Sequence, residues 1–89
     1  MLDVRRLRVL KEVAEQGSFS AAAESLAYTQ SAVSQQIAAL ERESGATLVD
    51  RGPRGIRLTD AGRALVTHAE DILCRLGAAE AELEAIAGL

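Results

Sequence analysis

The sequence predicts a mainly α-helical fold in which a compact head of three helices and a two-stranded hairpin precedes one long helix. Three observations predict it. Apolar residues recur at helical spacing in four segments, cap-forming residues and glycines separate these segments, and the spacing changes to two between residues 48 and 58. The composition agrees, since 48% of the residues are hydrophobic and only 2% are aromatic. The core must therefore be built from aliphatic side chains, which suit packed helices.

The chain length allows one compact core with an appendage, because 89 residues are too few for two independent cores. We divide the chain into a head over residues 1–58 and a linker helix over residues 59–89. No apolar run approaches the roughly 20 residues that span a bilayer, and the first residues lack the apolar stretch of a signal peptide, so we expect a cytoplasmic protein. We expect no metal or cofactor, and we expect the single His68 and Cys74 to be helix-packing residues.

Two short amphipathic patterns open the chain. In residues 3–16, apolar side chains recur three and four residues apart, which predicts a helix that Gly17 ends. Ser20 is of a type that caps helix N-termini, and the small residues after it predict a second, short helix over residues 21–26. These small side chains would let a neighbouring helix approach closely.

A third helix is predicted between Thr29, as its N-cap, and Gly45, as its stop. Its residues Val33, Ile37 and Leu40 lie at i, i+4 and i+7, so they form one face that must be buried. The opposite face is polar and almost uncharged, and its small or amide side chains can approach the edges of DNA bases. The residues on or beside this face include Gln30, Ser31, Ser34 and Gln35.

Residues 48–58 predict a β-hairpin, because short alternating runs flank the turn-forming sequence Gly52-Pro53-Arg54-Gly55. Arg51, Arg54 and Arg57 follow one another here without an acidic residue between them. We interpret the hairpin as a wing whose arginines suit phosphates or a narrow minor groove. The alternative is an ordinary solvated turn.

The charge is unevenly distributed along the chain. The formal net charge is -3, which is unfavourable for contact with phosphates. Residues 1–58 hold eight Lys or Arg against seven Asp or Glu, a net charge of +1, whereas residues 59–89 hold two against six, a net charge of -4. No charged residue occurs between Glu24 and Glu41. A phosphate that approaches the third helix or the wing therefore meets no local repulsion.

Thr59 caps a long last helix that is predicted to reach about residue 87. Its apolar residues recur at alternating spacings of four and three, and a single helix cannot bury such a seam on itself, so a second copy of the chain is the expected partner. The alternative is that the seam docks on the head of its own chain. The helix would span roughly 40 Å, enough to hold two heads about 34 Å apart, the spacing of successive major grooves. The seam comprises Leu65, Ala69, Ile72, Leu76, Ala79, Leu83 and Ile86.

The whole pattern resembles the LysR-type transcriptional regulators. The resemblance covers essentially the entire chain, and it is carried by Gly17-Ser18-Phe19-Ser20 with Ala22-Ala23, by Gln30-Ser31-Ala32-Val33-Ser34-Gln35-Gln36-Ile37, and by Leu58-Thr59-Asp60-Ala61-Gly62. It implies a winged helix-turn-helix followed by a linker helix that pairs antiparallel with its twin. It also implies a homodimer that binds an inverted repeat in double-stranded promoter DNA and regulates transcription.

The resemblance also implies roles for individual residues. Gln30, Ser31, Ser34 and Gln35 would read bases, and Arg54 would contact the minor groove. Ser31 and Gln35 stand where the family commonly has Pro and Arg, so the base preference can differ. Relatives carry a ligand-sensing domain after the linker helix, so a small-molecule inducer is expected only if such a domain follows this chain. The residues implied to contact the DNA backbone are Ser18, Ser20, Thr29, Gln36 and Arg51.

One other class of function stays open from the residues alone. The chain could be a winged-helix module for dimerisation or protein interaction that does not bind DNA, which the acidic total would favour and the charge distribution would not. We do not expect an enzyme, because the sequence contains no paired carboxylates near a histidine, no glycine-rich phosphate loop and no metal-ligand spacing.

Overall fold

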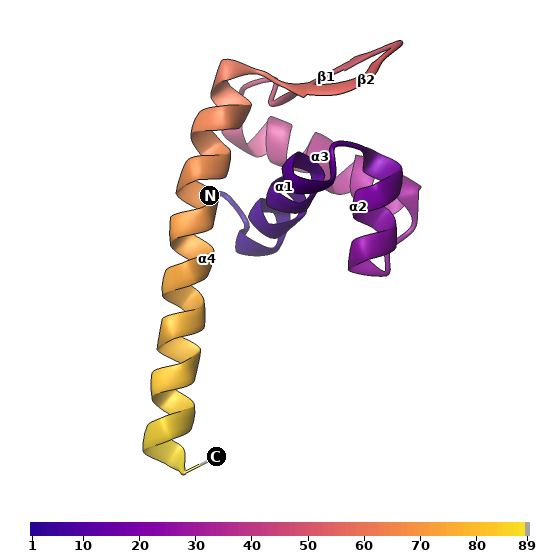
Figure 1. The fold of residues 1–89 in the computed structure, drawn as a ribbon. Helices are drawn as coiled ribbons and strands as arrows, with labels where there is room; N and C mark the ends of the chain where they lie inside the picture. The colour runs from indigo at the N-terminus through magenta and orange to yellow at the C-terminus, as the bar shows by residue number, and fades with distance from the viewer. Residues whose placement is uncertain (89) are drawn as a thin grey trace.

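The computed structural model describes residues 1–88 as four helices and one antiparallel pair of strands. Figure 1 shows helices α1 to α3 gathered into a head, the hairpin β1–β2 above them, and α4 running past the head and well beyond it. The predicted fold class is confirmed. No helix among residues 1–88 is both long and apolar enough to cross a membrane. The elements are α1 (Val4–Gln16), α2 (Phe19–Leu26), α3 (Gln30–Ser44), β1 (Val49–Gly52), β2 (Gly55–Leu58) and α4 (Asp60–Ala87).

Side-chain caps fix where the helices begin. The hydroxyls of Thr29 and Thr59 accept hydrogen bonds from backbone amides at 3.0 Å at the starts of α3 and α4, as predicted. At α2 the predicted cap is wrong. Ser18 has the extended backbone of an N-cap and accepts from the Ala21 amide at 3.0 Å, whereas Ser20 lies inside the first turn. The helix therefore begins earlier than expected, and Phe19 is its first residue.

The core lies between the three head helices, the start of the wing and the first half of α4. The predicted apolar face of α3 is confirmed, since Val33, Ile37 and Leu40 are at most 1% exposed. They pack with buried aliphatic residues of α1 and α2 in one hydrophobic cluster. The other buried members are Leu7, Val9, Leu10, Val13, Phe19, Ala22, Ala23, Leu48, Val49 and Ala69.

The hairpin is held to α3 by a carboxylate. Glu41 Oε2 accepts hydrogen bonds from the backbone amides of Leu48 at 2.8 Å and Val49 at 3.4 Å, directly where β1 begins. The strands pair from Val49 with Leu58 to Gly52 with Gly55, so the turn is the two residues Pro53–Arg54. The predicted hairpin is therefore confirmed, and its base is fixed relative to α3.

The first half of α4 packs on its own head. Ala69 is fully buried in this packing, and Leu65 is partly buried against the same core. Placing Ala69 in a dimer seam was therefore wrong, because the head of the same chain already covers it. Spacing alone could not reveal this, since a heptad pattern shows which residues share a face and not what covers them.

The second half of α4 extends away from the head and carries large exposed apolar side chains. The exposed fractions are 41% for Ile72, 38% for Leu76, 65% for Leu83 and 78% for Ile86. His68 and Cys74 are also exposed, so our expectation that they pack against other residues was wrong. The apolar face that remains without a partner in one chain thus begins at about residue 72.

The wing, the core and α4 meet at Gly62. A Cβ at this position would lie 2.1 Å from the Leu48 carbonyl oxygen, far closer than van der Waals contact. Nearby, the Thr59 amide donates to the same carbonyl at 3.0 Å, and the Thr59 hydroxyl donates to the Thr47 carbonyl at 2.6 Å. Only glycine lets the helix backbone approach the strand this closely.

We predict that Gly62→Ala lowers the free energy of unfolding by about 1–3 kcal/mol, because the clash with Leu48 outweighs the gain of about 1 kcal/mol in helix propensity. The matched control is Gly77→Ala. A Cβ at Gly77 meets nothing within 4 Å, so this change should raise stability by about 0.5–1 kcal/mol. Urea unfolding of both variants measures the difference, and equal stabilities would contradict the close approach.

Candidate nucleic-acid interface

The exposed side of α3 forms one polar, almost uncharged surface, with Arg42 at its C-terminal end. Gln30, Ser31 and Gln35 are exposed, and Ser34 is half-buried beside them. This surface is opposite the buried Val33, Ile37 and Leu40, as the sequence predicted. The first turn of α3 carries no acidic residue, so the partial positive charge of the helix N-terminus is not neutralised there. The polar side chains of this surface can donate and accept hydrogen bonds, and they do not repel a negatively charged ligand.

Arg51 joins the wing to α3 and α2. Its guanidinium Nη2 donates to the Ser34 hydroxyl at 2.8 Å, and its Cζ lies 4.4 Å from the centroid of the Phe19 ring. The aromatic face and the hydroxyl hold the planar guanidinium from two sides. Because Ser34 accepts from Arg51, its hydroxyl proton remains free to donate. The structure therefore couples a residue predicted to read bases with one predicted to contact the DNA backbone.

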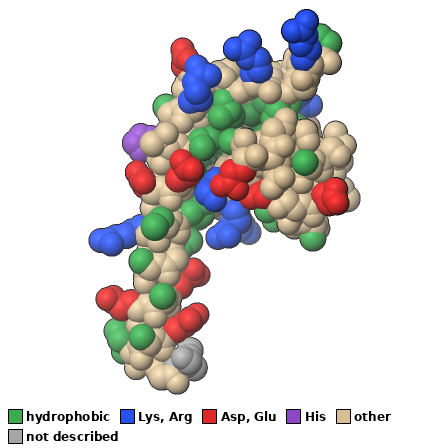
Figure 2. All heavy atoms as spheres, viewed as in Figure 1, with side chains coloured by type: hydrophobic (Ala, Val, Ile, Leu, Met, Phe, Trp, Pro, Cys, Tyr) green, Lys and Arg blue, Asp and Glu red, His purple; other side chains and the backbone are tan. Residues whose placement is uncertain are grey.

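The wing carries three arginines close together. Arg51, Arg54 and Arg57 are exposed, and none of the four ion pairs found within residues 1–88 includes any of them. Arg54 lies at the turn, and Arg57 pairs across the strands with Asp50 in the backbone register. In Figure 2 blue side chains line the wing at the top of the molecule, while red side chains lie on the head below it and along α4. The positive charge is therefore concentrated beside the exposed face of α3.

Three of the other predicted backbone contacts lie at helix N-termini. Ser18 and Thr29 use their hydroxyl oxygens to cap α2 and α3, while Ser20 is exposed in the first turn of α2. The first turn of α2, like that of α3, holds no acidic residue. Backbone amides at such ends favour anions, so these positions suit phosphate groups.

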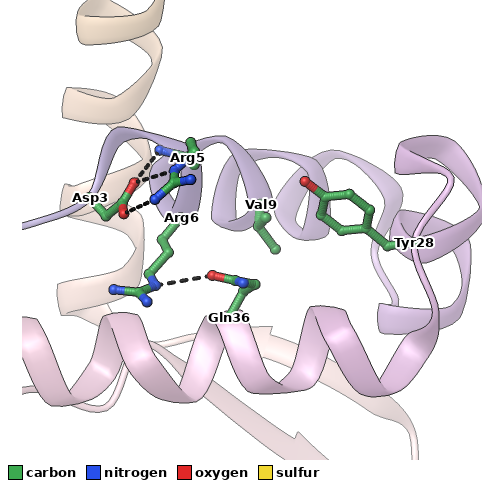
Figure 3. A pocket seen from close by; sticks show the side chains of 6 residues that line it. All are labelled: Asp3, Arg5, Arg6, Val9, Tyr28 and Gln36. Carbon is green, nitrogen blue, oxygen red and sulfur yellow. Dashed lines mark hydrogen bonds and ion pairs between the residues drawn. The ribbon is translucent and has the colours of Figure 1, made fainter.

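Gln36 is placed differently from its neighbour Gln35. Its carbonyl oxygen accepts a hydrogen bond from Arg6 Nε at 3.0 Å, and Arg6 also pairs with Glu43, so Gln36 links α3 to α1. Figure 3 shows this pair beside a small pocket that Tyr28 and Val9 also line. The structure thus gives Gln36 a role in holding α3, in place of a free side chain on the polar face.

Arg5 and Asp3, which form an ion pair, line the same pocket. Hydrogen bonds from the Arg5 side chain and amide to the Asp3 carboxylate hold the pKa of Asp3 below its ordinary value (Figure 3). The Asp3 carboxylate also caps α1. Arg5 and Arg6 are each engaged by an acidic group, so their charge is less available than that of the wing.

Two residues that position the interface were missed by the sequence reasoning. The sequence analysis gave Phe19 no part in the interface, yet its ring supports the Arg51 guanidinium. Glu41, which fixes the start of the wing, carries no separate signal in the sequence. An isolated carboxylate near a helix end is usually solvated, and only the tertiary fold shows its two amide partners.

Helices α2 and α3 joined by a tight turn, with α1 behind them and a hairpin beside them, define a winged helix-turn-helix domain (Figure 1). The chain belongs to the lysR family of bacterial regulatory helix-turn-helix proteins, whose model matches residues 4–63. The resemblance inferred from the sequence is therefore confirmed.

Individual relatives agree with the family. The chain is 48% identical over 68 residues to a "Probable RuBisCO transcriptional regulator" of Nostoc sp., covering 76% of this chain and 20% of the relative. It is 51% identical over 72 residues to an "HTH-type transcriptional regulator in ibpB-leuC intergenic region" of Azotobacter vinelandii, covering 81% and 50%. The chain thus matches a fifth to a half of the length of these two relatives.

A solved structure agrees over nearly the full chain. The structure described as "CbnR_DBD-DNA complex" is 37% identical, with a TM-score of 0.90, and the match covers 97% of this chain and 99% of the other. The similarity extends beyond the family-model match, so it includes the long helix α4 as well as the head.

Proposed function

We propose that this chain binds double-stranded DNA sequence-specifically as a homodimeric transcriptional regulator. The exposed face of α3 enters the major groove, the wing enters the minor groove, and two copies bind an inverted repeat in a promoter. The observation that carries the proposal is the almost uncharged polar face of α3 beside three wing arginines that form no ion pair within residues 1–88. This activity is binding without catalysis, and we place it on cytoplasmic, nucleoid DNA.

The roles of the α3 residues follow from hydrogen-bond geometry. Gln30 and Gln35 each offer an amide that can pair with adenine through two hydrogen bonds, and Ser31 and Ser34 can donate to a base acceptor. Arg54 at the wing turn suits the negative potential of a narrow minor groove. Ser18, Ser20, Thr29 and Arg51 are proposed to contact phosphates, which fixes the register of α3 on the duplex.

The acidic net charge does not oppose this proposal, because the acids are segregated. The wing carries three arginines against one acid, Asp50, and residues 25–40 carry no charge, whereas most red side chains in Figure 2 lie on the head below the wing and along α4. A structural neighbour described as a DNA complex supports the same use of the fold. A pure interaction module would have no reason to keep residues 25–40 free of acids beside an arginine-rich wing.

The dimer is proposed to form through the second half of α4. The side chains of Ile72, Leu76, Leu83 and Ile86 remain 38–78% exposed on one face of the helix, with the exposed Ala79 among them. A row of large apolar side chains at heptad spacing on a projecting helix is typical of a helix that pairs with another. Leu65 and Ala69 are no longer included, because they pack on their own head.

We predict that Gln35→Ala relaxes the sequence preference at one position of each half-site, with a loss of about 1–3 kcal/mol for the preferred base, because the amide pair with that base is removed. Selection of bound sequences from a random duplex pool measures this effect. Gln16→Ala, an exposed glutamine at the end of α1, is the control and should leave the preference unchanged. An unchanged preference in Gln35→Ala would remove the residue from base reading.

Arg51→Ala is predicted to weaken binding to all duplexes alike and to reduce the salt dependence by about one phosphate contact. Arg8→Ala is the matched control, since Arg8 is exposed on α1 and has no ion pair among residues 1–88. Affinity for several duplexes is measured across a salt series. A DNA-binding chain should have an affinity for duplex DNA that decreases as the salt concentration rises. If the wild-type chain has no such affinity, the alternative of an interaction module replaces DNA binding.

Leu76→Asp is predicted to convert the dimer to monomers, because a charge would be buried in the apolar contact between two α4 helices. Ala81→Asp adds the same charge on the exposed, opposite side of α4 and should leave the dimer intact. Sedimentation velocity measures both variants. If the Leu76→Asp variant sediments as a dimer like the wild type, this face is not the interface.

A further inference from the structure

Arg75 and Glu82 lie on one edge of the exposed apolar face of α4. They are about two helical turns apart, so they project from the same side of the helix. With Ala78 and Ala79 they line a shallow groove of about 290 Å³. Because the two alanines are small, the groove leaves room for a large side chain from another molecule above them.

Neither charge has an ion-pair partner among residues 1–88. The four ion pairs among residues 1–88 involve other residues, and Arg75 and Glu82 are both exposed. The other basic residue of α4, Arg63, pairs with Asp60. Arg75 is therefore the one cation of this helix, in the part of the chain that the structure describes, that is not already used.

We propose that Arg75 forms an ion pair with Glu82 of the partner subunit, twice in each dimer, and that these pairs fix the register of two antiparallel α4 helices. The proposal rests on the dimer proposed above. The apolar residues of α4 occupy two alternating positions of the seven-residue repeat. In an antiparallel pair, a residue at one of these positions faces a residue at the other position of the partner helix. Leu76 then packs over the partner's Ala79, in the groove described, and Ile72 packs against the partner's Leu83. The same alignment brings Arg75 beside the partner's Glu82.

The two neighbouring registers are both unfavourable. A shift by one repeat in one direction places Arg75 beside the partner's Arg75, and a shift in the other direction places Glu82 beside the partner's Glu82. Like charges at such edges destabilise a helix pair. Apolar packing alone tolerates several registers, so the charges select one.

The register matters because it sets the distance between the two heads. A shift of one heptad repeat changes that distance by about 10 Å along the helices, which corresponds to about three base pairs. Such a change would turn the second α3 away from the groove of its half-site. The Arg75–Glu82 pair would thus determine which half-site spacing the dimer accepts.

The test uses charge reversal and rescue. In Arg75→Glu, glutamate would face glutamate across the dimer, and in Glu82→Arg, arginine would face arginine. Each variant alone should raise the dimer dissociation constant about tenfold or more, because two attractions become two repulsions. An equimolar mixture should form heterodimers with nearly wild-type affinity, because both contacts are attractive again. The double variant R75E/E82R should also dimerise like the wild type. Sedimentation equilibrium with one variant labelled measures all four.

Two further variants make the result specific. Glu84→Arg makes the same charge change away from this edge and should leave the dissociation constant unchanged. In a parallel pair Arg75 would instead face the partner's Glu80, so rescue of Arg75→Glu by Glu80→Arg, and not by Glu82→Arg, would overturn the proposal. Mixtures of the two reversals that show no preference for heterodimers would also overturn it. A wild-type chain that sediments as a monomer would instead overturn the dimer itself.

Discussion

The burial of one face of α3 is the constraint on which the rest of the structure depends. Val33, Ile37 and Leu40 are at most 1% exposed, so the rotation of α3 about its axis is fixed by the core. Burying three such side chains stabilises the head by several kcal/mol, about 1.5–3 kcal/mol for each. A rotation by one residue position, about 100°, would bury Ser34 or Gln36 and expose a core residue. The polar face is therefore exposed as a direct consequence of hydrophobic packing on the other side.

The wing is positioned by the same helix. Glu41 lies one residue after Leu40, and its carboxylate accepts the amides of Leu48 and Val49 where β1 begins. At the other end of the hairpin, Thr59 bonds to the Thr47 and Leu48 carbonyls, and Gly62 lets α4 close against the strand. The hairpin is thus tied to the core at both strands. This explains how Arg51 can reach Ser34 and Phe19 with a defined geometry on an otherwise exposed element.

Local signals gave most of the fold from the sequence, and tertiary contacts account for what was missed. Thr29 and Thr59 were found as caps because each directly precedes a helical pattern, whereas two serines flank Phe19 and only backbone geometry shows that Ser18 is the cap. The polar face of α3 followed from its apolar period. Ala69 was wrongly assigned to the dimer seam, because packing on the head and packing on a partner helix require the same spacing of apolar residues along α4. The contacts of Gln36 and Glu41 join segments distant in sequence, so no local pattern encodes them.

The long helix combines two functions along its length, and its charges follow that division. Its first half supplies Gly62 and Ala69 to the core of its own chain, where small residues permit close packing. Its second half leaves large apolar residues exposed between acidic side chains and a single arginine. Acids on this half lie far from the wing along a molecule about 50 Å long, which is several Debye lengths at physiological salt. They can therefore influence how two helices pair without opposing the approach of phosphates to the wing.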